Sequence, residues 1–148
     1  MFEGQIYGVT NGVITILSLI TGLRATNVNK IGIIGALCAM MIADPLSDSY
    51  SIYVAEKHSK KKTAYLSSKN AFFYQFLLQF IFFIIILVTK DIDRGILYTY
   101  IFGIMVTIVF GKYLNINNIN IIKNLLSIFV IVVITYFFDS SVCKYEKF

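Results

Sequence analysis

Apolar residues gather in five long runs along this chain, and short clusters of charged residues or asparagines separate the runs. The runs cover residues 6–23, 31–54, 70–89, 95–114 and 121–138. Each run is close to the roughly 20 residues with which an α-helix crosses a hydrocarbon layer about 30 Å thick. Because a helix satisfies its own backbone hydrogen bonds in lipid, the pattern predicts an all-α protein with five transmembrane helices.

The composition favours a membrane protein over a soluble one. Hydrophobic residues make up 57% of the chain, and there is one proline in 148 residues. A soluble domain of this size cannot bury so much apolar material. The opening residues lack the basic stretch of a secretory signal, so we expect the first span to stay in the mature protein. We therefore expect one transmembrane domain, residues 1–148, in contact with lipid along most of its length.

The positive charge is concentrated beside one predicted span. The net charge is +5, and five of the thirteen basic residues lie in the segment 56–69 between the second and third spans. Contact with anionic lipid headgroups explains this cluster better than nucleic-acid binding does. By the positive-inside rule, loop 56–69 is cytoplasmic, and five spans then place the N-terminus in the cytoplasm as well.

Small and polar residues share one side of the first span. Gly8, Asn11, Thr15, Ser18 and Gly22 recur at spacings of three and four, which places them on a single helical face. Such a stripe is typical of close helix packing, because small residues let two backbones approach. A pathway-lining role for Asn11 and Thr15 is an equally good interpretation, since polar groups in a span usually face a partner or a cavity.

The second span carries a more specific pattern. Asp44 and Asp48 are four residues apart, so both carboxylates point from one face of an apolar helix. Two like charges in such surroundings need compensation by a cation, by protonation of one carboxyl or by a basic neighbour. No Lys or Arg lies deep within a predicted span, which argues against the third solution. The competing interpretation places this stretch beyond the membrane, in a cytoplasmic extension of the helix.

Further potential ligands lie close to the two carboxylates. Pro45 has no backbone N–H, so the carbonyl oxygen of Met41 loses its helical hydrogen bond near Asp44. Carboxylate, hydroxyl and carbonyl oxygens are the ligands that hard cations prefer. We therefore predict Asp44 and Asp48 as metal ligands, and expect the polar faces of the first two spans to meet each other or a symmetry mate. The residues of this span that we expect along the ion pathway are Met40, Met41, Ser47 and Ser51.

The polar residues of the third and fourth spans indicate structural roles. Gln75 and Gln79 share a face of the third span, where hydrogen bonding between helices is their expected use. In the fourth span, small residues recur at a spacing of four: Thr99, Gly103, Thr107 and Gly111. This ladder predicts a tight helix crossing.

The sequence gives no indication of an enzyme. Cys38 and Cys143 lack a nearby partner at a metal-ligand spacing, and His58 lies within a run of lysines, where we expect it to be exposed. No nucleophile, base or metal triad stands out near a predicted membrane interface.

Two segments resemble the first two spans of the vacuolar iron transporter family. Residues 7–15 read Tyr-Gly-Val-Thr-Asn-Gly-Val-Ile-Thr, and the family has an Asp-Gly pair followed by an apolar residue and Ser or Thr in this region. Residues 42–56 resemble the family's Ala-Asp-x-x-Ser signature, with Glu56 near the cytoplasmic end of the helix. The resemblance covers residues 4–56, and beyond them it is one of topology only.

The resemblance implies a five-span homodimer whose first two helices line a path between the subunits. It implies export of Fe²⁺ or Mn²⁺ from the cytosol to a vacuole or to the exterior, in exchange for protons. It also adds Asn11 and Glu56 to Asp44 and Asp48 as metal ligands. The ion is cargo, so we expect no permanently bound cofactor.

The chain departs from the family pattern at three places. Asn11 replaces the Asp of the first span and carries neither a charge nor a transferable proton. Asp48 stands where the family has a Met ligand, which exchanges a soft sulfur for a hard oxygen and favours Mn²⁺ or other hard cations. The segment between the second and third spans has no room for the Glu-rich metal-loading domain of the plant-type members. These losses keep open an alternative function, that of a non-transporting membrane scaffold or assembly protein.

Overall fold

The protein is all-helical in this computed structural model, which describes residues 3–59, 62–113 and 117–145. The helices are α1 (Glu3–Ala25), α2 (Lys30–His58), α3 (Ala64–Val88), α4 (Ile92–Tyr113) and α5 (Asn118–Tyr145). These ranges contain no strand. The all-α prediction is confirmed.

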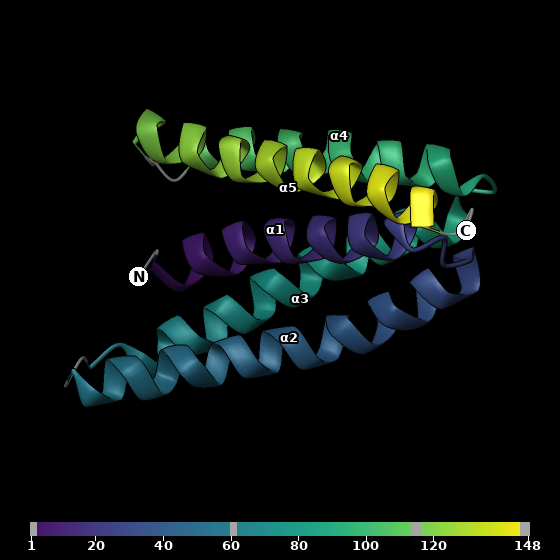
Figure 1. Cartoon of the computed structure of the whole chain (residues 1–148). Coiled ribbons are helices and arrows are strands. Elements are labelled where there is room, and N and C mark those ends of the chain that lie inside the picture. Colours follow the sequence, from purple (N-terminus) through teal and green to yellow (C-terminus); the bar gives the residue numbers. More distant parts are fainter. Residues whose placement is uncertain (1–2, 60–61, 114–116, 146–148) are drawn as a thin grey trace.

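Successive helices run antiparallel and form one elongated bundle (Figure 1). Helix α1 lies in the middle and contacts α2 and α3 on one side and α4 and α5 on the other. Its fully buried residues Ile16, Leu17 and Ile20 belong to the same core cluster as Phe82 and Ile86 of α3. The core of the bundle therefore follows the length of α1.

Four of the described helices, α1 to α4, are long and apolar enough to cross a membrane. The fifth predicted span, 121–138, is tested only in part. Within α5, residues Asn118–Ile134 form an apolar helix that is shorter than the other four. Several side chains after Ile134 lie outside the described residues. Large apolar side chains such as Phe73, Leu97 and Phe129 are more than half exposed. Such a surface fits a lipid environment, as expected of a multi-pass membrane protein.

The helices are longer than the apolar runs that predicted them. Helix α2 continues to His58 and α3 begins at Ala64, so most of the predicted loop 56–69 is helical and the connection is short. The reason is that charged residues end an apolar run without ending a helix, since Lys and Glu are good helix formers. Helix α2 also continues through Pro45.

Small residues bring α1 unusually close to α3. A Cβ atom placed on Gly8 would lie 2.6 Å from the carbonyl oxygen of Ala71, which is too close for any side chain, and Gly4 meets the backbone of Ser67 in the same way. One turn further along, a Cβ on Gly12 would lie 3.3 Å from the Cγ atom of Gln75. This crossing holds the middle of α1 directly against the middle of α3.

The small-residue ladder of α4 also packs tightly, as its spacing predicts. A Cβ on Gly103 would lie 3.0 Å from Leu17 of α1, and one on Gly111 would lie 2.6 Å from Ile121 of α5. Thr99 is completely buried, and its hydroxyl donates a hydrogen bond to the carbonyl oxygen of Ile96. The ladder therefore joins α4 to both neighbouring helices.

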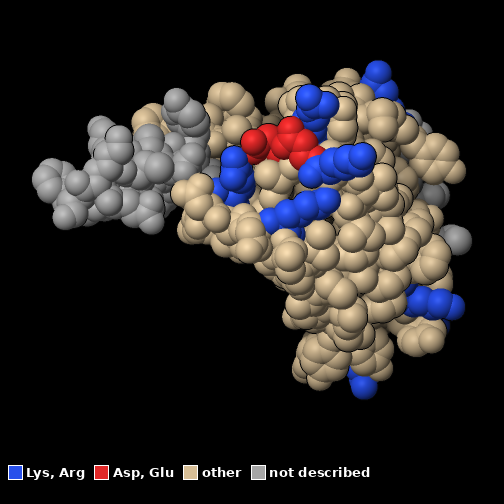
Figure 2. All heavy atoms as spheres, turned by 90° about the vertical axis from the view of Figure 1, so that its right-hand side faces the viewer, with Lys and Arg blue, Asp and Glu red and all other residues tan. Residues whose placement is uncertain are grey.

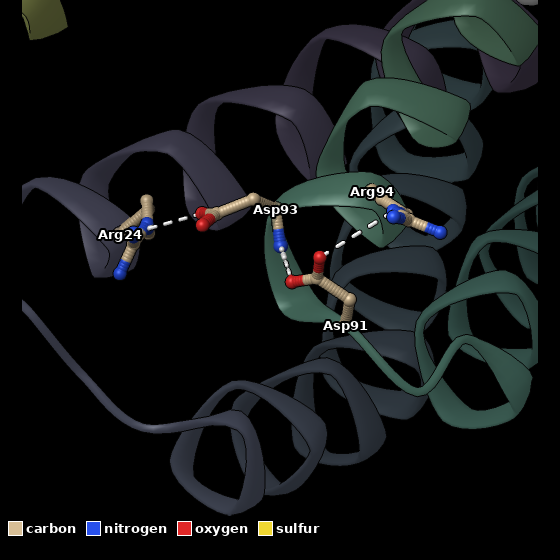
Figure 3. A network of polar contacts seen from close by, with 4 residues as sticks. All are labelled: Arg24, Asp91, Asp93 and Arg94. Carbon is tan, nitrogen blue, oxygen red and sulfur yellow. Dashed lines mark hydrogen bonds and ion pairs between the residues drawn. The ribbon is translucent and has the colours of Figure 1, made fainter.

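Charged side chains gather at the end of the bundle where α1 meets α2 and α3 meets α4. Figure 2 shows basic side chains around a small acidic patch at this end. Arg24 and Asp93 form an ion pair of 2.8 Å, and the Asp91 carboxylate accepts the backbone N–H of Asp93 and lies 3.5 Å from Arg94 (Figure 3). The ammonium group of Lys30 donates to the carbonyl oxygens that end α3. These contacts tie the connections together outside the apolar part of the bundle.

Candidate cation site

Asp44 and Asp48 of α2 point at α3, where one glutamine contacts both carboxylates. The side-chain nitrogen Nε2 of Gln75 lies 2.7 Å from Oδ2 of Asp44 and 2.8 Å from Oδ2 of Asp48. The match follows from geometry, because residues four apart on one helix are stacked along its axis and a side chain from a neighbouring helix fits between them. The predicted shared face of the two carboxylates is thus directed into the bundle.

Two further amides complete this arrangement. Gln79 Nε2 lies 2.6 Å from Oδ2 of Asp44, and Asn11 of α1 donates a hydrogen bond to Oδ2 of Asp48. We call Asn11, Asp44, Asp48, Gln75 and Gln79 the amide–carboxylate cluster. It joins three helices and confirms that the polar faces of the first two spans meet at Asn11 and Asp48.

The cluster is closed on the α3 side and partly open on the other. Gln75 and Gln79 are 0% exposed, whereas Asn11, Asp44 and Asp48 are each only partly buried. The close α1–α3 crossing at Gly8 and Gly12 seals the inner side. An ion could therefore reach the carboxylates from the outer side without unpacking α3.

Amide groups are the hydrogen-bonding partners that the structure gives these carboxylates. No basic side chain in the described ranges bonds to either one. Amide N–H groups stabilise carboxylates but bring no net positive charge. The repulsion between the two neighbouring negative charges is therefore not removed. Of the three solutions offered by the sequence, a bound cation or a proton on one carboxyl therefore remains.

Two open cavities lie beside α1. One borders its first half, up to Ile14, and the other borders its second half, from Thr15 onward. One, of about 480 Å³, is lined by Tyr7, Thr10 and Asn11 together with Asn120 and Asn124 of α5. The other, of about 400 Å³, lies beside the second half of α1. Its lining consists of Thr15, Ser18, Leu19, Gly22, Leu23 and Met40. The polar stripe of α1 thus has two surroundings, since Gly8 packs on α3 while the later residues face open space.

The other predicted site residues lie at varying distances from the cluster. Thr15 is one turn from Asn11 and donates its hydroxyl to the Asn11 carbonyl oxygen. Ser51 donates to the carbonyl oxygen of Ser47, and both serines are exposed. Met41 is partly buried, and Pro45 cannot donate the helical hydrogen bond to its carbonyl oxygen.

Glu56 is not brought to the cluster. It follows Asp48 by eight residues on the same helix, which corresponds to about 12 Å along the axis. Its Oε2 atom is buried without a hydrogen-bond partner among the described residues. The structure therefore groups three of the four predicted ligands, Asn11, Asp44 and Asp48, and leaves Glu56 two turns away.

Gln75 and Gln79 are the site residues that the sequence did not assign to the site. Their predicted use in hydrogen bonding between helices is confirmed. The signal that links them to the site is their spacing of four, which equals the spacing of Asp44 and Asp48. On two helices that pack side by side, equal spacing allows two pairs of side chains to meet.

The donor set consists of carboxylate and amide groups. Within the described ranges, no three His, Cys, Asp or Glu side chains come close enough to hold a metal ion by themselves. Any ion at this site would depend on amide oxygens as well as on the two acids, and an all-oxygen set suits hard cations.

Comparisons with known proteins add no further assignment: no protein-family profile, no curated protein and no solved structure matches the chain.

Proposed function

We propose that this protein transports divalent metal ions, Mn²⁺ or Fe²⁺, out of the cytosol. The observation that carries the proposal is the amide–carboxylate cluster, in which two acids of α2 lie side by side against uncharged amides. Ionisable groups within a membrane span are costly and usually mark the path of an ion or a proton. The resemblance of residues 4–56 to the vacuolar iron transporter family points to the same function.

The two cavities support a route across the membrane. Asn11 belongs both to the cluster and to the lining of the 480 Å³ cavity. The 400 Å³ cavity begins at Thr15, one helical turn further along the same stripe. Neither lining includes Asp44 or Asp48, so the proposed route passes the carboxylates through Asn11, which bonds to Asp48.

The lysines of one helix connection support a proposed orientation of the chain in the membrane. Lys57, Lys62 and Lys69 lie around the α2–α3 connection, at the end of the bundle where α1 begins (Figure 1). By the positive-inside rule, we propose that this end faces the cytoplasm. The 480 Å³ cavity includes the first turns of α1, so it would open toward the cytosol as the entrance.

The test is a flux assay on the full chain in proteoliposomes, comparing Fe²⁺, Mn²⁺, Co²⁺ and Ca²⁺. Asp44→Asn and Asp48→Asn remove a charge with little change of shape. If binding limits flux, each should lower Mn²⁺ or Fe²⁺ transport by about tenfold or more, which corresponds to about 1.4 kcal/mol. Asp91→Asn is the matched control, because Asp91 is exposed at a helix connection, and it should transport like the parent.

A non-transporting scaffold is the second candidate. It is favoured by the hydrogen bonds that already join the two acids to α1 and α3, since such bonds hold helices together in lipid. The same assay separates the two functions. A scaffold gives no flux above that of empty liposomes, and Asp44→Asn then changes only the thermal stability of the protein.

A further inference from the structure

Two buried oxygen atoms in the amide–carboxylate cluster lack hydrogen-bond partners. The Nε2 atoms of Gln75 and Gln79 are used three times, twice toward Asp44 and once toward Asp48. The Oε1 atoms of the same two amides are fully buried and have no hydrogen-bond partner among the described residues. Each glutamine thus donates through its amide nitrogen, while its amide oxygen accepts no hydrogen bond from the described residues.

This imbalance is unusual for a network whose only task is to hold helices together. Most buried side-chain polar atoms have a hydrogen-bond partner, and an unsatisfied buried group is destabilising. Here two unsatisfied oxygens come from neighbouring turns of one helix, and both belong to amides aimed at a pair of acids. A terminal amide exchanges its nitrogen and oxygen by a half-turn of its last torsion, with little change in the space that it occupies.

We propose that Gln75 and Gln79 are cation ligands as well as hydrogen-bond donors, and that their amides turn over when an ion binds. Without an ion, the N–H groups face the Asp44 and Asp48 carboxylates and hold both acids in place. With an ion, the Oε1 atoms face the cation beside the carboxylate oxygens. This inference rests on the proposed transport function and deepens it, because it names the ligands and the class of ion.

The resulting ligand set selects a hard divalent cation. It consists of two carboxylates and two glutamine oxygens, to which Asn11 can add a third amide oxygen by the same turn. Carboxylate, amide and carbonyl oxygens suit Mn²⁺, Ca²⁺ and Mg²⁺, whereas soft ions prefer sulfur. Competition between the N–H groups and the ion also keeps binding reversible, which transport requires.

The experiment measures Mn²⁺ and Cd²⁺ binding to the full chain in lipid nanodiscs by titration calorimetry. Gln75→Met and Gln79→Met keep the size of the side chain, remove its N–H and oxygen atoms and supply a soft sulfur. We expect Mn²⁺ affinity to fall by about tenfold or more and Cd²⁺ affinity to fall by less than about threefold. Thr99→Val, which alters another fully buried polar side chain on α4, is the control and should bind both ions like the parent.

A second variant keeps the oxygen ligand but makes it titratable. Gln79→Glu should bind Mn²⁺ within about threefold of the parent at about pH 8, where carboxyl groups are normally ionised. Its affinity should then fall more steeply on acidification, because one more carboxyl must lose a proton for the ion to bind. A proton dependence equal to that of the parent would show that the side chain at position 79 takes no part in ion binding.

The outcomes separate this inference from the proposed function. If both Met variants bind Mn²⁺ and Cd²⁺ like the parent while Asp44→Asn loses Mn²⁺, the glutamines are structural and only the inference fails. If the parent binds no ion, or Asp44→Asn binds like the parent, both fail. If the Met variants do not fold, Gln79→Glu decides, and a proton dependence equal to that of the parent overturns the inference.

Discussion

Asp48 is the residue at which the chain departs most in chemistry from the family signature proposed for residues 42–56. It accepts hydrogen bonds from Asn11 of α1 and Gln75 of α3, so it lies between the helix that borders the cavities and the helix that closes the site. In that proposed signature a methionine sulfur stands in this place. A change at this single side chain should therefore alter the kind of ion more than the fold.

Asp48→Met restores a sulfur atom and removes one charge. We expect Fe²⁺ transport to persist, because Fe²⁺ accepts softer ligands, while Ca²⁺ and Mn²⁺ transport falls by about tenfold or more. Proteoliposome uptake of the three ions, normalised to the amount of folded protein, is the measurement. Equal losses for all three ions would show that Asp48 does not set the selectivity.

The α1–α3 crossing is the element on which the site depends. Gly4, Gly8 and Gly12 meet α3 along its successive turns at Ser67, Ala71 and Gln75. Each pair is four residues from the next on both helices. The same close packing therefore fixes the position of Gln75 along α1, beside Asn11. Glycine is needed at positions 4 and 8, because no Cβ fits between the two backbones there.

Gly8→Ala should therefore separate α1 from α3. Its new Cβ would lie 2.6 Å from a backbone oxygen, and we expect a loss of about 1–3 kcal/mol in stability, as in other overpacked cores. Gly35→Ala is the matched control, since nothing lies within 4 Å of its added Cβ, and it should change stability by no more than about 1 kcal/mol. Thermal unfolding in detergent compares the two, and equal melting temperatures would argue against the close crossing.

At the scale of the whole molecule, the cavity beside the second half of α1 is open along one side of the bundle. It exposes Thr15, Ser18 and Gly22, which are small or polar residues that lipid does not favour. A second copy of the chain that packs its own α1 there would cover these residues and enclose the proposed ion route. We therefore expect a two-fold homodimer in which the first helices pair.

Disulfide cross-linking in membranes tests this pairing. In a background that carries Cys38→Ser and Cys143→Ser, Ser18→Cys should yield a cross-linked dimer under mild oxidation. Ile101→Cys, on a half-exposed position of α4, should remain monomeric. Preferential cross-linking at position 101, or a purified monomer that transports ions, would contradict pairing through α1.

The sequence by itself determined the helices and the shared face of Asp44 and Asp48. Apolar runs of membrane length become helices whatever their neighbours, because a helix satisfies its own backbone groups in lipid. A spacing of four places two side chains on one face of any helix. Both properties are local. The order of the helices and the carboxylate pair could therefore be predicted without knowing which helices pack against each other.

Only the tertiary structure decided what the carboxylates face. The contacts that form the site join residues 27 to 37 positions apart, and they depend on how closely α1, α2 and α3 approach. Periodicity shows that Gln75 and Gln79 share a face but not which helix lies opposite. That choice is made by the packing of Gly8 and Gly12 against α3, a steric fit between distant segments that no local pattern contains.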